Sequence, residues 1–472
     1  MTLRHTLALL LLAASPAFAQ PGTQQPGAKP ATKLPEKPDD MAEFDKELDA
    51  LFPGKGLTAD EAARRAIQTS PNVSRSAADI EAAIAEAKAA EVARIPVVGI
   101  VGRYTRLSEV TLPRIDFGGM GFSFPQFLNT FDVTARGSVT ISDYFVRFPK
   151  FLEAARLGEE AARLSRRSTE LNDGQDARVA YYEWVRAKLQ VLISKRQLAQ
   201  VKSTVTQFRA LAEVQRVSRA DLMRVESQEA TAEQTVIQLE YIASLREEQL
   251  RVLIDAPEGQ PLVIGEHIRQ DVTAPAEIPL EAMVKTARRQ RLDFKVLDAG
   301  IEARLKQAEG ERSNMYPKLG VFAEATYSNP NQRIFPQQDE FNFTWAAGAQ
   351  ISWTLNEALI SKTIQDKALA NARGLKADKI NLERGTRVQL LSAAQAVSIA
   401  QAALETSKKG LAAAEEGYRV RRELLNAERA TAVELVDAET ELTRARIAAL
   451  NARVDLRLAL TQLAHALGDD VK

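Results

Sequence analysis

The chain has 472 residues, which is enough for two or more ordinary domains. Its 62 Lys and Arg residues balance 62 Asp and Glu residues, so the net charge gives no reason to expect nucleic acid as a partner. The absence of Cys excludes disulfides, thiol nucleophiles and thiolate metal sites.

The N-terminus has the pattern of a secretory signal peptide over residues 1–19. Arg4 and His5 precede the apolar run LALLLLAA, and an A-x-A cleavage site ends at Ala19. Residues 20–56 follow as a tether rich in Pro that leads into a short helix. No later segment has about 18 consecutive apolar residues, so we expect an exported protein without a transmembrane helix.

The rest of the chain contains an internal duplication. Residues 57–96 and 278–317 are similar segments that both end in Pro, and SRADLMRVE (218–226) matches TAVELVDAE (431–439). Each copy reads as helix, strand, strand, long helix and helix. The predicted boundaries are repeat 1 at 57–254, an irregular linker at 255–277, repeat 2 at 278–468 and a C-terminal tail at 469–472.

Pro96 and Pro317 stand at the predicted junction between the first helix and the first strand of each repeat. Proline lacks an amide donor and disfavours helix for the residue before it, so it can end a helix where an extended segment begins. An ordinary loop proline is the alternative. Because a proline occupies the equivalent position in both repeats, we favour its interpretation as a helix–strand junction.

Each repeat is predicted to hold a β-hairpin, at about 97–145 and about 318–355. In FNFTWAAGAQISWTL (341–355), apolar residues alternate with small or polar ones, which places the two kinds on opposite faces of a strand. A strand that crosses a bilayer needs about 9–11 residues, and the candidate strands reach that length. Alternation with aromatic ends is typical of a transmembrane β-barrel, and the aromatic residues predicted to face lipid are Phe131, Phe341, Phe343, Trp345 and Trp353.

A soluble sandwich, or a sheet half-covered by helices, is the alternative for these strands. If they do enter a membrane, four strands cannot close a barrel, because the smallest bacterial barrels have about 8. Open sheet edges are not tolerated in hydrocarbon, where unpaired backbone groups find no water. Several copies must then share one barrel, so we expect an obligate oligomer.

Long helices are predicted to flank the hairpins. The stretch from Pro149 to about Val217 has no internal Pro, and as one helix it would be roughly 100 Å long. In the last helix a large residue recurs every seven positions and Ala recurs three positions later, which predicts a closely packed coiled-coil seam. The two series are Leu435, Leu442, Ala449, Leu456 and Leu463, and Ala438, Ala445, Ala452, Ala459 and Ala466. An Ala-rich helix in a soluble bundle would show similar spacing.

Over residues 57–468 this arrangement resembles the TolC family of outer-membrane channel proteins. The resemblance implies a mainly α fold with a transmembrane β portion: a homotrimer whose twelve-stranded β-barrel in outer-membrane lipid is continued by an α-helical coiled-coil tunnel in the periplasm. It also implies an exit duct of a tripartite efflux or type I secretion system. The implied partners are a periplasmic adaptor (membrane fusion protein) and an inner-membrane pump of the RND, ABC or MFS type.

The resemblance also implies roles for residues near the helix-pair turns. The acids that would narrow the periplasmic entrance are Glu434, Asp437 and Asp221. Acids repeated about a symmetry axis form a ring that attracts cations, whereas ordinary solvated helix acids are the alternative. Two family features are missing, since Gln215 and Glu428 replace a frequent turn Gly and Ala430 replaces a latch Arg. The adaptor would meet the helix tips at Ser218, Arg219, Ala220, Thr431, Ala432 and Val433.

Enzymatic chemistry finds little support in the sequence. The three His residues have no metal-ligand spacing, and FGGMGFS (117–123) lacks the Lys and the strand–helix context of a phosphate loop. We therefore expect no catalytic residues, no cofactor and no metal. A secreted or periplasmic coiled-coil adaptor or scaffold protein, without a membrane barrel, is the alternative to a channel.

Overall fold

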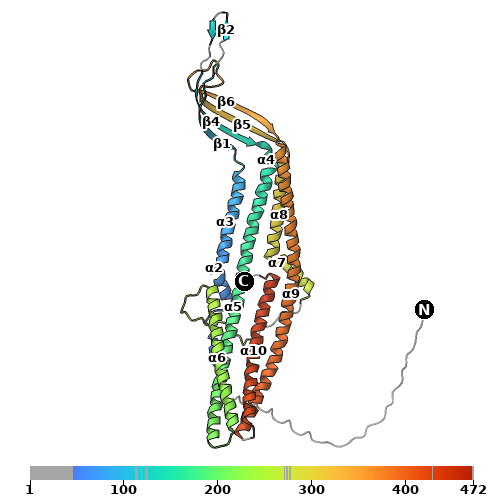
Figure 1. Ribbon diagram of the computed structural model, residues 1–472. Helices are drawn as coiled ribbons and strands as arrows, with labels where there is room; N and C mark the ends of the chain where they lie inside the picture. The colour runs from blue at the N-terminus through green and yellow to red at the C-terminus, as the bar shows by residue number, and fades with distance from the viewer. Residues whose placement is uncertain are drawn as a thin grey trace, which may run out of the picture.

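The computed structural model describes residues 46–111, 115–118, 120–122, 126–270, 272, 275, 278–427 and 429–469. The predicted signal peptide, the tether up to residue 45 and most of the predicted C-terminal tail lie outside the described residues. Figure 1 shows an elongated molecule with a β-sheet near one end and long helices that run away from it. Residues 46–50 are helical and precede the elements that repeat.

The described elements confirm the duplicated order of helix, strand, strand, long helix and helix. Repeat 1 holds α2 (Ala59–Thr69), α3 (Pro71–Val92), β1 (Val97–Arg106), β2 (Ile115–Phe117), β3 (Met120–Phe122), β4 (Asn129–Thr140), α4 (Ile141–Phe145), α5 (Arg147–Glu213) and α6 (Arg219–Leu253). Repeat 2 holds α7 (Leu280–Gln290), α8 (Leu292–Arg312), η1 (Ser313–Met315), β5 (Lys318–Asn329), β6 (Asn342–Ser352), α9 (Leu355–Asn426) and α10 (Ala432–Leu467).

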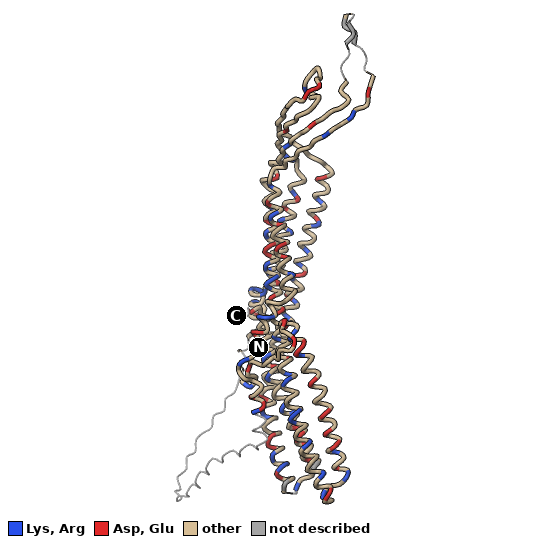
Figure 2. Tube along the Cα trace, turned by 90° about the vertical axis from the view of Figure 1, so that its left-hand side faces the viewer, with Lys and Arg blue, Asp and Glu red and all other residues tan. Residues whose placement is uncertain are grey.

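Helices α5 and α9 form the frame of the molecule. They contain 67 and 72 residues, so each is roughly 100 Å long and reaches from the sheet to the far end (Figure 1). Near the sheet the packed pairs are α3 with α5, α5 with α8, and α8 with α9. At the far end they are α6 with α5, α5 with α10, and α10 with α9. Basic and acidic residues are interspersed along the helical part of the molecule (Figure 2).

Helix α5 begins and ends at places that its sequence explains. It begins at Arg147, two residues before Pro149, because the first amides of a helix need no intrahelical acceptor and proline is tolerated there. It ends at Glu213, earlier than predicted, and Gln215 follows with a left-handed φ of 55°. The amide of Arg216 donates to the carbonyl of Leu211 at 2.9 Å, which satisfies one of the last carbonyls.

The predicted seam of the last helix is present between α10 and α9. Leu442 is 0% exposed and Leu456 is 3% exposed, and the Ala residues of the second series let the two helices approach closely. Two apolar clusters follow the seam. One joins Leu435 and Leu442 to Tyr418 of α9, and the other joins Leu456 and Leu463 of α10 to α9 residues such as Leu390, Val397 and Leu404.

A different pattern joins α5 to α6, and the sequence analysis did not identify it. Four basic residues of α5, spaced seven apart, pair with four Glu residues of α6, also spaced seven apart. This charge ladder consists of Lys188–Glu247 at 2.7 Å, Lys195–Glu240 at 2.6 Å, Lys202–Glu233 at 3.9 Å and Arg209–Glu226 at 2.9 Å. The constant spacing means that one face of each helix carries one sign of charge along the whole hairpin.

The linker between the repeats packs around the middle of the bundle. The amide of Leu57 donates to the carbonyl of Val263, and the amide of Gly265 donates to the carbonyl of Leu57, both at 2.8 Å. A Cβ atom on Gly265 would lie 2.3 Å from the carbonyl oxygen of Gly56, so only glycine allows this approach. Beneath it lies the largest described core, which includes Trp184 at 0% exposure.

Candidate functional site

The four long strands form one antiparallel sheet in the order β1-β4-β5-β6. Its register sets Val133 beside Tyr327 and Phe343, and in the next apolar row sets Ala135 beside Ala325 and Trp345. The alternating stripes recognised separately in each strand therefore combine into one apolar face. Phe343, Trp345 and Ile351 are 64%, 70% and 76% exposed, so no helix covers this face.

The opposite face of the sheet is polar and internally bonded. The hydroxyl groups of Thr134 and Thr326 lie 3.1 Å apart, and Arg136 lies 3.9 Å from Glu324. Phe322, which broke the alternation of its strand, lies on this face, where the guanidinium carbon of Arg136 is 5.2 Å from its ring centroid. A large apolar residue is thus accommodated there by a cation–π contact.

The strand ends differ in part from the prediction. Residues 141–145 form the short helix α4 rather than strand, and Asp143 in it is buried and pairs with Arg147 at 3.2 Å. Phe131, Phe343 and Trp345 lie within strands. Phe341 and Trp353, however, flank β6 instead of belonging to it.

These two flanking aromatic residues are held at opposite ends of the sheet. The indole N–H of Trp353 donates to the carbonyl of Met315 at 3.1 Å, at the end next to the helices. The ring of Phe341 stacks on Tyr327 at 5.1 Å between centroids, at the end far from the helices. Pro96 lies between α3 and β1, and Pro317 lies between η1 and β5. Among the described residues, no helix has the length and apolar character that crossing a membrane requires.

The sheet has two open edges within the described chain. β1 pairs only with β4, and β6 pairs only with β5. Each edge strand of 10 or 11 residues therefore presents unpaired amide and carbonyl groups along its outer side.

The far ends of the two helical hairpins, which we call the helix tips, carry the predicted entrance residues. In repeat 1, Ser218 caps α6 by accepting from the amide of Asp221 at 3.0 Å, and its hydroxyl donates to the Asp221 carboxylate at 2.6 Å. Arg219 and Ala220 form the exposed first turn of α6. Asp221 is therefore part of a cap as well as an acid at the tip.

In repeat 2, Thr431 and Glu434 form a reciprocal capping box. The amide of Thr431 donates to the Glu434 carboxylate at 3.2 Å, and the amide of Glu434 donates to the Thr431 hydroxyl at 3.4 Å. Arg421 of α9 also lies 3.1 Å from the same carboxylate. Glu434 thus ties α9 to α10, in a turn where Ala430 offers no charged side chain.

Asp437 lies one turn beyond Glu434 on α10 and is exposed. Within the described part of the chain, no hydrogen bond or ion pair holds its carboxylate. The structure thus separates the two acids of the pair, because one is bound in a cap and the other faces solvent. Of the other predicted tip residues, Ala432 begins α10 and Val433 follows it.

Solved structures share this architecture over nearly the whole chain. The match to CusC has a TM-score of 0.72 at 14% sequence identity and covers 94% of this chain and 99% of that one. The match to the outer-membrane channel OprN has a TM-score of 0.72 at 16% identity and covers 94% of this chain and 98% of OprN. The match to VceC from Vibrio cholerae has a TM-score of 0.70 at 17% identity and covers 92% of this chain and 99% of VceC. The chain therefore has the fold of outer-membrane channel proteins.

The second repeat resembles a known protein family in sequence. Residues 283–469 match the family model described as outer membrane efflux protein. No curated protein matches the chain. The family match covers the second repeat, and it agrees with the shared fold and with the resemblance to the TolC family.

Proposed function

We propose that three copies of the chain form one channel, which serves as the exit duct of a tripartite export system. The observation that carries this proposal is the sheet with one apolar face, one polar face and two open edges. Hydrocarbon requires every backbone group to be paired, so β1 of one copy must join β6 of the next. Three sheets closed in this way make a barrel of twelve strands with its apolar face toward lipid.

The helices support the same closure. At the far end of the bundle, α6 packs mainly on α5, and its free flank exposes Tyr241 (74%), Leu245 (57%) and Val252 (72%). The opposite outer helix α9 exposes Val388 (67%) and Ile399 (69%). Exposed apolar rows on the two outer helices fit burial against neighbouring copies. Three four-helix layers joined in this way would make a tunnel that continues the barrel.

The helix tips would then open into the periplasm, where they would meet an adaptor and, through it, an inner-membrane pump. The exposed residues Arg219 and Ala220 and the half-buried Val433, all in the first turns of their helices, would form the docking surface. Asp437 of three copies would form the cation-attracting ring at the entrance, and Glu434 would mainly hold each tip in shape. The sequence analysis assigned both acids to the entrance. We propose instead that Asp437 lines the pore and that Glu434 mainly stabilises the turn between α9 and α10.

The mass of the purified protein in mild detergent and its conductance in planar bilayers test this function together. We expect a trimer that forms ion-conducting channels. Asp437→Asn should lower the preference for K⁺ over Cl⁻ and leave the thermal midpoint unchanged, whereas Glu434→Gln should also lower the thermal midpoint. Single subunits without channel activity would refute the proposal.

A further inference from the structure

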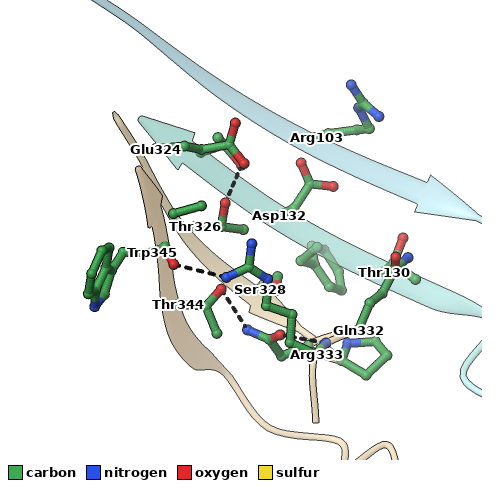
Figure 3. Close-up of a pocket in the computed structure, with 15 residues that line it drawn as sticks. Arg103, Thr130, Asp132, Glu324, Thr326, Ser328, Gln332, Arg333, Thr344 and Trp345 are labelled. Carbon is green, nitrogen blue, oxygen red and sulfur yellow. Dashed lines mark hydrogen bonds between the residues drawn. The ribbon is translucent and has the colours of Figure 1, made fainter. Parts of the chain in front are cut away.

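The connection between β5 and β6 folds back over the polar face of the sheet. Asn331 in this connection is 3% exposed and Ser328 before it is 9% exposed, although the sheet carries no other layer. Between the connection and the sheet lies a cavity of about 350 Å³. Figure 3 shows its lining, with Gln332 and Arg333 on one side and Thr326 and Thr344 on the other.

Asn331 holds the connection in this position. Its side-chain amide donates to the carbonyl of Asn342 at 3.0 Å and to the hydroxyl of Thr344 at 3.4 Å. Its side-chain oxygen accepts from the amide of Arg333 at 3.0 Å. One buried side chain thus bonds both the strand and the turn, which fixes where Arg333 leaves the backbone.

Arg333 extends across the cavity toward the sheet. Its guanidinium group donates to the carbonyl of Trp345 at 2.9 Å, while the indole of Trp345 points away from the cavity (Figure 3). A guanidinium group has five N–H donors, so a single bond to a carbonyl leaves donors for other ligands. The group is exposed, and it lies on the polar side of the sheet.

The charged residues of the strands around Arg333 lie in pairs of opposite sign. Arg103 lies directly opposite Asp132 in the register of β1 and β4, and Arg136 pairs with Glu324 at 3.9 Å. Within the described residues, no ion pair joins Arg333 to a carboxylate. Of the charged residues in the β5–β6 connection, Arg333 lines the cavity, whereas Asp339 and Glu340 are exposed and are not among its lining residues. Arg333 therefore brings one positive charge to this part of the polar face.

We propose that the β5–β6 connection narrows the outer exit of the pore and that Arg333 there favours anionic cargo over cationic cargo. This inference rests on the proposed trimeric channel, because the polar face becomes the pore wall only in the closed barrel. Three copies of Arg333 would surround the exit. Small organic carboxylates and phosphates would then pass this end more readily than amines of the same size.

Reversal potentials in a KCl gradient test the charge of the exit, with the trimer in planar bilayers. Removing a unit charge from the pore wall changes the local concentration of a permeating ion by about twofold. Arg333→Gln should therefore lower the ratio of Cl⁻ to K⁺ permeability by about that factor. Arg333→Glu should lower it further, and Arg333→Lys should keep it. An unchanged ratio in Arg333→Gln would overturn the inference.

Arg106 provides the matched control. It lies at the same end of the sheet, but its place in β1 puts it on the apolar face, and its guanidinium group donates to the side chain of Asn129 at 2.8 Å. Arg106→Gln removes the same charge outside the pore, so it should leave the permeability ratio unchanged. An equal shift in both variants would mean a general surface effect and would also overturn the inference.

The absence of Cys gives a second test within one channel. Arg333→Cys introduces a single thiol, which a positively charged thiosulfonate reagent and a negatively charged one can modify during recording. We expect the positive reagent to restore the wild-type ratio and the negative reagent to shift it toward K⁺. Modification without any change would place residue 333 outside the pore. Loss of all conductance in the wild-type protein would instead refute the proposed function.

Discussion

The two helical hairpins at the far end of the molecule have the same ancestry in the sequence but are held together differently. In repeat 1, α6 packs mainly on α5, and the charge ladder runs beside a small buried cluster that includes Phe208 of α5 and Val225 of α6. In repeat 2, α10 packs between α9 and α5, and large and small apolar residues alternate along its seam. Exposed ion pairs are worth little and buried apolar contacts are worth much more. The comparison therefore predicts that the apolar seam of repeat 2 contributes more to stability than the charge ladder of repeat 1.

Shortening a seam residue should have the largest effect. Leu442 of α10 is fully buried, so Leu442→Ala should lower the free energy of unfolding by about 2–5 kcal/mol. The thermal midpoint of the detergent-solubilised protein measures this loss. Met223→Ala in α6, where the side chain is 48% exposed, should change the free energy by less than about 0.5 kcal/mol. Equal losses in the two variants would contradict the comparison.

Placing a larger side chain in the contact between α9 and α10 should have the next largest effect on stability. Ala459 is 5% exposed and belongs to the apolar cluster between α10 and α9, so Ala459→Leu should cost about 1–3 kcal/mol by overpacking. The control is Ser244→Leu on the exposed side of α6, which meets solvent and should be nearly neutral. Thermal unfolding of both variants under one condition is sufficient, and a stabilised Ala459→Leu would show that the seam contains unfilled space.

Reversing one charge of the ladder should have a smaller effect. Lys195 and Glu240 are about half exposed, so Lys195→Glu should cost at most about 1 kcal/mol. The double variant Lys195→Glu with Glu240→Lys should recover that loss. In 1 M salt the Debye length is about 3 Å, so the difference between the single and double variants should fall. A loss that salt does not reduce would have a cause other than the ion pair.

The smallest expected effect is a pH dependence of stability, which arises from His465 near the C-terminal end of α10. Burial, together with the positive charge of Arg291, lowers the pKa of His465 in the folded protein. The unfolded chain, with a His pKa of about 6.5, then binds the proton more readily, so stability is present above that pH and falls as the pH decreases through it. His465→Gln should reduce this acid sensitivity, measured as the difference in thermal midpoint between pH 7.5 and pH 5.5.

Features that depend on local periodicity were predictable from the sequence. The stripe of Phe343 and Trp345 follows from a period of two, and the Leu442 seam follows from a period of seven. Neither needs knowledge of a partner element. The same holds for the duplicated order of the elements, which repeated spacing makes visible.

Features that depend on pairing between distant elements were not predictable. The charge ladder becomes visible only when the register of α5 against α6 is known. The strand prediction continued through Ile141 because its alternation is correct, but burial of Asp143 beside Arg147 favours a helix there. Likewise, the T-x-x-E spacing of TAVELVDAE permits a capping box at Thr431 and Glu434, but the ion pair between Glu434 and Arg421 of α9 becomes visible only in the structure.

The unbroken lengths of α5 and α9 limit how the channel can move. Both helices connect the sheet to the tips without a break, so in the proposed channel tilting either of them would pull on the strands of the barrel. Helices α6 and α10 extend only from the tips to the middle of the bundle (Figure 1). If the proposed channel widens at its periplasmic mouth, we therefore expect movement of α6 and α10 to disturb the barrel least, and the widening to be confined to the half of the duct that these two helices line.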